Sequence, residues 1–276
     1  MDVAVVVTTY NRPDALAAVL DGYGEQTDQG FELIVADDGS TDETRDLVAA
    51  FRSRAPMPVR HVWQEDAGFR AGAARNRAVA SSRAEYIIFT DGDCVPAHGF
   101  VAGHKRLSRR GFFLAANRVL LSEACTREVL AAKEPVQRWD WTDWLKRWAR
   151  RDVNRLLPLL TLPDGGWRNR DPQRWKGVKT CNLSVWRQDL LRVNGFDESY
   201  EGWGLEDSDL VIRLLHAGVS HKSARFAAPV FHLWHKENDR SRLARNQQRL
   251  EELLHSEQTR ANRGLDQYLA PAASPV

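Results

Sequence analysis

The chain has 276 residues, of which 43% are hydrophobic and 28% charged, a composition typical of a soluble globular protein with a sizeable core. A formal net charge of +2 is too small to point to a nucleic-acid partner. The three cysteines are widely spaced and form no CxxC pair. Neither a zinc ribbon nor a disulfide framework is therefore expected, and the odd count fits a reducing compartment.

The N-terminus shows no basic segment followed by an apolar one, and no apolar run approaches the roughly 18 residues needed to cross a bilayer. We therefore expect no signal peptide, no membrane anchor and a cytoplasmic location.

The first hundred residues alternate apolar, β-branched runs with helical patterns. The apolar runs predict strands at 3–7, 31–36, 59–63 and 86–90. The helical patterns cover 14–23, 41–54 and 72–81, with Ser40 or Thr41 as the cap of the second helix. This alternation predicts an α/β fold with a mostly parallel sheet flanked by helices.

Polar clusters follow three of the predicted strands: Thr8-Thr9-Tyr10-Asn11, Asp37-Asp38-Gly39-Ser40 and Asp91-Gly92-Asp93. Ligands of such sheets bind outside the carboxyl ends of the strands. We therefore expect the three clusters to converge on one crevice. In the second cluster a carboxylate suits hydrogen bonds from a base or a ribose, although helix capping is an equal alternative for Ser40.

The Asp91-Gly92-Asp93 cluster presents two carboxylates on one tight turn. Mg²⁺ and Mn²⁺ prefer carboxylate oxygens combined with substrate phosphates, so this turn is a candidate metal site. An ordinary acidic turn is the alternative. The place of the turn after an apolar strand, beside two other polar clusters, favours the metal site.

A further acidic segment, Gly202-Trp203-Gly204-Leu205-Glu206-Asp207-Ser208-Asp209, precedes an apolar helical pattern that stops at Gly218. The tryptophan between two glycines suits a platform for a sugar ring. A carboxylate near the helix start suits the general base that direct displacement at a sugar requires. The alternative is that Glu206, Asp207 and Asp209 only cap the helix, and for Asp209 we favour capping.

Two histidines, His232 and His235, follow a strand-like run and lie three residues apart. Either imidazole can complete a metal shell begun by Asp93, and the sequence does not distinguish between them.

The middle of the chain differs from both ends. Residues 101–160 contain 13 Lys and Arg but 6 Asp and Glu, and residues 101–170 show few strand signals beyond 112–115. Residues 139–160 predict an amphipathic helix with apolar Trp141, Trp144, Leu145 and Trp148 and basic Lys146, Arg147, Arg150 and Arg151. Such a helix suits an anionic membrane surface; alternatively, its tryptophans pack on the sheet or line an acceptor cleft.

Four stretches, VVVTTYNRPDAL, FELIVADDGSTDET, AGAARNRA and FTDGDC, together resemble the family 2 glycosyltransferases, which have the GT-A fold. The later stretch CNLSVWRQDLLRVNGFDESYEGWGLEDSDLVIRL resembles the carboxyl-terminal segment of β-1,4-galactosyltransferases, polypeptide GalNAc-transferases and bacterial chondroitin-type polymerases. GWGLEDSDL is the strongest single match. Residues 101–170 match nothing that we can assign.

The resemblance implies a role for each matching residue. The residues implied to bind the nucleotide are Thr8, Tyr10, Asp38, Arg75 and Asp91, the first three at the uridine. The residues implied to bind the metal are Asp93 and one of His232 and His235. The residues implied to contact the donor or acceptor sugar are Trp203, Gly204 and Glu206, and Asp207 is the implied catalytic base.

The resemblance also implies the reaction. We expect an inverting transfer of a hexose or N-acetylhexosamine from a UDP-sugar to a glycan or lipid-linked glycan, with Mn²⁺ or Mg²⁺ as cofactor and no nucleic-acid partner. The expected setting is surface-polysaccharide or lipopolysaccharide synthesis at the inner face of a bacterial plasma membrane, with possible contact through 139–160.

These expectations divide the chain into a nucleotide-sugar half (1–100), a helical, basic acceptor region (101–170), a catalytic half (171–240) and a C-terminal helix with its tail (241–276). Two rival functions stay open. A sugar-nucleotidyltransferase would need a Gly-rich, basic loop after the first strand, where this chain has TTYNRPDAL. A non-catalytic carbohydrate- or nucleic-acid-binding protein would make the acidic and histidine motifs a coincidence.

Overall fold

The computed structural model describes residues 1–236 and 239–269, which are built around a central sheet of seven strands. In spatial order the strands are β3 (Val59–Trp63), β2 (Glu32–Asp37), β1 (Val3–Thr9), β4 (Tyr86–Asp91), β8 (Asn182–Trp186), β6 (Phe112–Ala115) and β9 (Ser220–Ser223). Strand β8 runs antiparallel to both of its neighbours, whereas the other neighbouring pairs are parallel. The prediction of a mostly parallel α/β sheet is confirmed.

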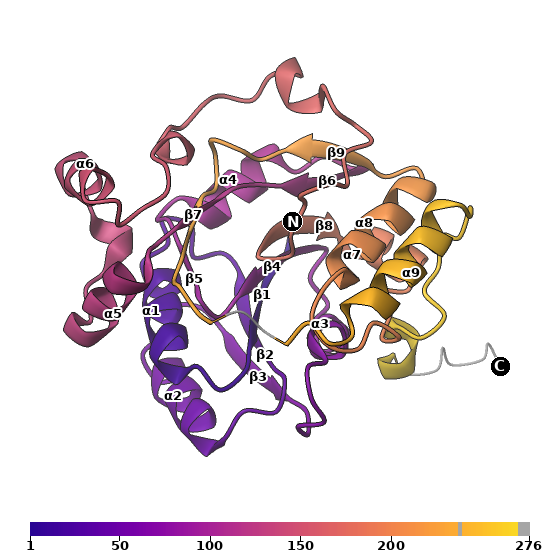
Figure 1. The fold of residues 1–276 in the computed structure, drawn as a ribbon, viewed down its shortest axis with the longest axis horizontal. Helices are drawn as coiled ribbons and strands as arrows, with labels where there is room; N and C mark the ends of the chain where they lie inside the picture. The colour runs from indigo at the N-terminus through magenta and orange to yellow at the C-terminus, as the bar shows by residue number, and fades with distance from the viewer. Residues whose placement is uncertain (237–238, 270–276) are drawn as a thin grey trace.

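Helices cover both faces of this sheet (Figure 1). One face carries α1 (Pro13–Gly24), α2 (Asp42–Arg52), α4 (Phe100–Leu107), α5 (Glu123–Ala132) and α6 (Trp141–Ala149). The other face carries α3 (Ala71–Ala80), α7 (Arg187–Val193) and α8 (Glu206–His216), with α9 (Leu243–Leu254) packed outside α8. Short 3₁₀ segments lie at Val136–Arg138, Leu157–Leu159, Gly166–Asn169 and Leu265–Tyr268.

The two cores explain why the first strand is apolar without interruption. Side chains of a strand alternate between its faces, so Val3, Val5 and Val7 enter one core while Ala4 and Val6 enter the other. The same argument holds for the other parallel strands. The elements predicted in the first hundred residues agree with the structure to within two residues at each end, β5 excepted.

A second, three-stranded sheet was not predicted as such. It contains β5 (Cys94–Pro96), β10 (Val230–His232) and β7 (Arg118–Leu120), with β10 in the middle. Strand β10 pairs antiparallel with β5, which places His232 opposite Cys94. Strands β5 and β7 have three residues each, which is too short for a periodicity to be recognised in a sequence. This small sheet brings the histidine segment beside the Asp91-Gly92-Asp93 turn.

The middle of the chain agrees with expectation in one strand and departs from it in two places. The strand signal at 112–115 is β6 of the central sheet, whereas β7 of the small sheet was not predicted. The helix predicted over 139–160 ends at Ala149, because Arg151 adopts a left-handed conformation with φ of 62° and stops it. Among the described residues, none of the helices has both the length and the apolar character needed to cross a bilayer.

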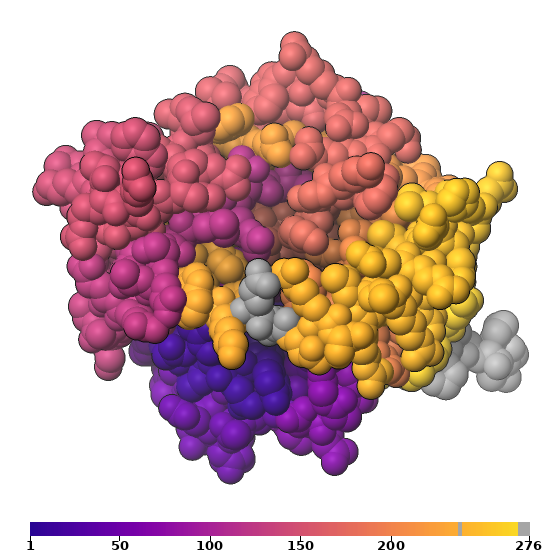
Figure 2. Space-filling view, viewed as in Figure 1, coloured from indigo at the N-terminus to yellow at the C-terminus, as the bar shows by residue number. Residues whose placement is uncertain are grey.

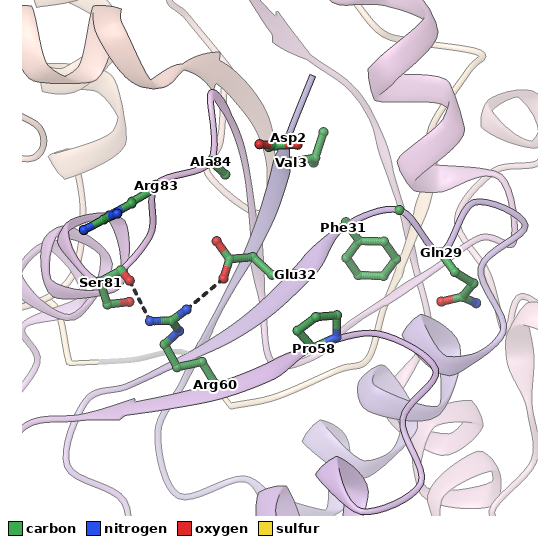
Figure 3. A pocket seen from close by; sticks show the side chains of 11 residues that line it. Asp2, Val3, Gln29, Phe31, Glu32, Pro58, Arg60, Ser81, Arg83 and Ala84 are labelled. Atoms are coloured by element: carbon green, nitrogen blue, oxygen red, sulfur yellow. Dashed lines mark hydrogen bonds and ion pairs between the residues drawn. The ribbon is translucent and has the colours of Figure 1, made fainter.

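A hollow of about 630 Å³ lies at the amino ends of β1 and β2, the edge opposite the polar clusters (Figure 3). One of its two arginines, Arg60, is engaged by Glu32 at 3.1 Å and by the carbonyl of Ser81 at 2.7 Å, and the other, Arg83, is exposed. The hollow is separated from the polar clusters by the length of the strands.

The buried His104 of α4 should make the stability of the protein depend on pH. Its ring is fully buried and faces the Ser184 hydroxyl at 2.7 Å and the Asn182 side chain at 3.0 Å. Burial lowers the pKa of His104 to about 4. Below an unfolded pKa of about 6.5 the unfolded chain takes up a proton that the folded chain does not, so the free energy of unfolding falls as pH drops from about 6.5 to 4.

We expect this single group to remove about 2 kcal/mol of stability between neutral pH and pH near 5, measured by urea unfolding. The variant His104→Gln should lack this part of the acid dependence. The matched control, His255→Gln, changes an exposed histidine and should keep it. Equal acid dependence in both variants would contradict the prediction.

Candidate active site

The predicted polar clusters meet at the carboxyl ends of β1, β2 and β4, and the guanidinium of Arg75 lies between them. Arg75 comes from α3 and is 4% exposed. It donates from Nε to the Thr8 hydroxyl at 3.0 Å, from Nη2 to Asp91 at 3.0 Å and from Nη1 to Glu206 at 3.2 Å. One side chain thus joins β1, β4 and the start of α8.

Small residues on α3 let Arg75 reach this position. Gly72 and its alanine neighbours are buried, and a side chain at Gly72 would meet Phe196 at 3.4 Å. The next residue, Asn76, bonds both main-chain groups of Phe196. Helix α3 is therefore fastened to the segment that leads into α8, which fixes the two halves of the crevice relative to each other.

The charges around Arg75 are shaped by burial. Burial raises the pKa of Asp91 and of Glu206, and the neighbouring Arg75 offsets this only in part. Burial also opposes the charge on Arg75, but attraction to Asp91 and Glu206 outweighs it and raises the pKa of the guanidinium. A cation is thus firmly held among several carboxylates.

The turn after β4 needs a glycine. A side chain at Gly92 would stand 2.9 Å from the Thr9 hydroxyl and 3.1 Å from the Thr8 carbonyl, and the Gly92 amide donates to that carbonyl at 2.7 Å. Any larger residue would push the turn away from β1. The glycine therefore keeps Asp91 and Asp93 against the end of the first strand.

Asp93 faces the two histidines that the sequence could not rank. Its carboxylate oxygens lie 3.8 Å from Nε2 of His232 and 3.5 Å from Nε2 of His235. The two imidazole rings are 5.3 Å apart. Both histidines therefore stand at one carboxylate, and the small sheet is what places them there.

This donor set fits a divalent cation. Burial lowers the pKa of His232 to about 4, so the imidazole is neutral and its lone pair is available at neutral pH. A carboxylate with neutral imidazoles suits Mn²⁺, and a carboxylate with substrate phosphates suits Mg²⁺. The Cys94 thiol also lies within 4.8 Å of Asp93 and His232. Burial raises its pKa, so it remains a neutral thiol and a poor ligand for hard ions.

The proposed uridine contacts flank the same edge of the sheet. Asp38 is 3% exposed and accepts hydrogen bonds from Gln64 at 2.6 Å and from the Arg70 amide at 2.7 Å. Tyr10 is 47% exposed, and its hydroxyl donates to Asp66 at 2.9 Å. A flat, exposed ring beside a buried carboxylate is an arrangement that can stack on a base and accept a hydrogen bond from its edge.

At the end of the second cluster, Ser40 does not cap α2 with its side chain. Its hydroxyl accepts from the Asn11 amide at 2.9 Å, and the Asn11 side chain accepts from the Thr41 amide at 3.0 Å. Thr41 occupies the cap position without a side-chain cap. These bonds tie the first and second polar clusters together instead.

The acidic segment before α8 lies on the other side of Arg75. The φ angles of Gly202, Gly204 and Leu205 are all positive, at 72°, 107° and 76°, which turns the chain sharply into the helix. Trp203 is partly exposed under the guanidinium of Arg240, at 5.0 Å. The Gly204 carbonyl accepts from Asn246 of α9 at 3.0 Å.

Asp207 is 5% exposed and its two oxygens differ. Oδ1 accepts from the Ser208 amide at 2.8 Å, whereas Oδ2 lies 3.4 Å from the ammonium of Lys179. Lys179 is half-exposed and was not singled out from the sequence. The backbone thus fixes Oδ1 of Asp207. Oδ2 can interact with the ammonium of Lys179 or with a group of the substrate.

The capping expected for Asp209 is wrong. Asp209 lies inside α8 rather than at its cap, and it accepts from Nε of Arg213 at 2.9 Å. Arg213 is fully buried and also donates to the Val193 carbonyl at 2.6 Å. The pair is a structural element between α8 and α7, one helical turn away from the crevice.

Comparison with known proteins points to a glycosyltransferase. Residues 4–112 match the family described as glycosyl transferase family 2, and residues 169–236 match one described as the N-terminal domain of galactosyltransferase. The two matches support a family 2 glycosyltransferase. The second match includes residues 202–209.

Among curated proteins, the chain is 32% identical over 238 residues to validoxylamine A glucosyltransferase from Streptomyces hygroscopicus subsp. jinggangensis, covering 78% of this chain and 52% of that protein. The chain spans about half the length of the two validoxylamine A glucosyltransferases that it matches.

Solved structures share the fold. A mannosyltransferase from Pyrobaculum calidifontis, in complex with GDP-Man and Mn²⁺, has a TM-score of 0.57 at 19% identity, over 85% of this chain and 57% of that one. Residues 1–349 of S. aureus TarS, in complex with UDP, have a TM-score of 0.59 at 15% identity, over 97% of this chain and 68% of that one. Both neighbours are GT-A glycosyltransferases, which confirms the predicted fold class.

Removing the positive charge of Arg75 should destabilise the protein. The variant Arg75→Met leaves Asp91 and Glu206 buried without their partner, and breaking such a buried pair typically costs about 3–5 kcal/mol. We expect a loss of this size in the free energy of unfolding, measured by urea titration, and a smaller loss for Arg75→Lys. The control Arg77→Met changes an exposed arginine of the same helix. Similar losses in Arg75→Met and Arg77→Met would refute the assignment.

Proposed function

We propose that this protein transfers a hexose or N-acetylhexosamine from a UDP-sugar to a hydroxyl of a glycan or lipid-linked glycan, with inversion and with Mn²⁺ or Mg²⁺. The observation that carries the proposal is the three-way contact of Arg75 with Thr8, Asp91 and Glu206. It brings the candidate metal turn and the acidic segment before α8 into one crevice, as a donor bound between nucleotide and acceptor sites requires.

Within that crevice we assign the nucleotide to one side. Tyr10 would stack on the base, Asp38 would accept a hydrogen bond from its edge, and Asp91 would accept one from the ribose. Thr8 and Arg75 would fix the nucleotide side of the turn. The similarity to a UDP-bound and a GDP-Man-bound protein supports a nucleotide-sugar donor, and UDP is the nucleotide that we propose.

Asp93, His232 and His235 would hold the divalent cation. When bound, that ion would neutralise the charge that develops on the diphosphate leaving group. The protein's part is to keep His232 neutral, since burial lowers the pKa of His232 to about 4. The positive field of Arg75 adds to this stabilisation of negative charge.

The acceptor is assigned to the other side. Trp203 and Gly204 would form the wall on which the transferred or acceptor sugar rests, and Glu206 would accept a hydroxyl hydrogen bond. Oδ2 of Asp207 would take the proton of the acceptor hydroxyl as its oxygen bonds to the anomeric carbon and the bond to the diphosphate breaks. A single displacement of this kind inverts the anomeric centre.

On this assignment residues 1–100 form the nucleotide-sugar half, 101–170 the acceptor region, 171–240 the catalytic half and 241–276 a C-terminal helix and tail. We further propose work at the inner face of the plasma membrane, in surface-polysaccharide or lipopolysaccharide synthesis. A panel of nucleotide sugars tested for metal-dependent UDP release is the direct test. Absence of release with every UDP-sugar would overturn the proposed donor.

Replacing the proposed base should separate chemistry from binding. In Asp207→Asn the side chain keeps its shape but cannot take up the proton, and general base catalysis contributes typically 10²–10⁴-fold. We expect turnover to fall by about that range while UDP affinity stays near the wild-type value. The control Glu201→Gln alters an exposed acid of the same segment and should leave both unchanged. Near-normal turnover in Asp207→Asn would exclude this base.

Replacing the metal ligands should separate the metal from the base site. In Asp93→Ala and in His232→Gln we expect Mn²⁺-dependent UDP affinity to fall on the order of tenfold or more, because each loses a donor atom. Titration calorimetry with and without Mn²⁺ measures this. The control His216→Gln changes a histidine that bonds the Gln258 carbonyl away from the crevice. Unchanged Mn²⁺-dependent affinity in both variants would place the metal elsewhere.

A further inference from the structure

One face of helix α6 is packed and hydrogen-bonded against the rest of the protein. Trp144 is 4% exposed, and its ring packs 4.8 Å from that of Trp139 and 4.7 Å from that of Phe231. One turn later, Arg147 donates to Glu128 at 2.8 Å and to Glu134 at 3.0 Å. The helix is therefore held in one orientation on the body of the protein.

The adjoining face of α6 is apolar and exposed. Trp141, Leu145 and Trp148 are 51%, 53% and 52% exposed. At 3.6 residues per turn they fall within roughly 60° of one another, so they form one continuous stripe along the helix. Exposing two tryptophans and a leucine to water on one rigid stripe is unfavourable. Such a stripe is typical of a surface that binds a partner.

The surroundings of the stripe are positively charged. Lys146, Arg151 and Arg155 are exposed, whereas the exposed Arg150 pairs with Asp152 at 3.3 Å. The acids nearby are engaged within the protein, since Asp140 and Asp143 form the capping box of α6, and Glu134 and Asp152 face Arg147. The lobe that carries α6 forms the left flank of the molecule in Figure 2. The three side chains of the stripe are each about half exposed, so they can meet a partner.

We propose that this face of α6 docks on an anionic phospholipid bilayer. Tryptophan rings combine an apolar body with a polar N–H and settle at the boundary between headgroups and acyl chains. The leucine between them enters the acyl region, and the basic residues face the phosphate groups. A helix with this composition lies in the plane of the interface, and the full chain binds as a peripheral protein.

The position of α6 connects this surface to the crevice. Phe231, which packs against Trp144, precedes His232 on β10. Docking through α6 therefore holds the strand of the candidate metal ligand close to the lipid surface. The docking proposal does not rest on the sugar transfer, because it follows from the exposure and charge of α6 alone.

Co-sedimentation of the full chain with vesicles tests the proposal. The chain should pellet with vesicles of phosphatidylcholine containing about a third phosphatidylglycerol and bind far less to phosphatidylcholine alone, because each basic residue near an anionic surface contributes a roughly fivefold preference. Leu145→Ser should lower the partition coefficient by about tenfold. The matched control Leu254→Ser changes a leucine of α9 that is 41% exposed and should bind as the wild type does.

The double variant Lys146→Ser with Arg151→Ser should lower binding to the anionic vesicles and leave the weak binding to neutral ones unchanged. Failure of the wild type to pellet with anionic vesicles would overturn the proposal, as would equal binding of Leu145→Ser and Leu254→Ser. Sedimentation velocity tests the alternative that the stripe binds a second copy of the chain. A wild-type dimer that Leu145→Ser converts to a monomer would mean that the stripe binds a second copy and not a lipid surface.

Discussion

The candidate site depends on one buried cation. Asp91, Asp93, Glu206 and Asp207 all reach the same end of the sheet, and burial raises the pKa of Asp91 and of Glu206. Arg75 makes the gathering possible, since its guanidinium contacts Asp91 and Glu206 while remaining 4% exposed. Its third bond, to Thr8, ties the charge to the first strand. The sheet, the turn and α8 are therefore coupled through a single side chain.

The order of the central sheet decides which segments can contribute to this crevice. Because β8 runs against β4, the residues before β8 lie at the same edge as the residues after β4. Lys179 reaches Asp207 for that reason, and the Cys181 thiol lies within 4.8 Å of Asp91 and Cys94. The reversed strand thus brings the segment that precedes it, and not the one that follows it, to this edge of the sheet.

Much of this architecture could be predicted from the sequence, and the failures have physical causes. The strands of the first hundred residues are buried on both faces, so they appear as uninterrupted apolar runs bounded by polar turns. The convergence of TTYN, DDGS and DGD followed from parallel topology alone. Lys179 was not predicted, because the sequence of β8 does not indicate whether the strand runs parallel or antiparallel to β4. The length of α6 was overestimated because the stop lies in the backbone conformation of Arg151. Asp209 looked like a cap because its partner, Arg213, is visible only once the helix is packed.

The small sheet has a consequence for how the protein is made. Strand β10 pairs with β5 and β7, which lie much earlier in the chain, so the histidines can meet Asp93 only after most of the protein has left the ribosome. Contacts of such long sequence separation close late in folding. An incomplete chain can therefore have its nucleotide-side strands in order while Asp93 still lacks its two imidazoles. The corner where Asp93 faces the two histidines is therefore complete only when both ends of the fold have come together.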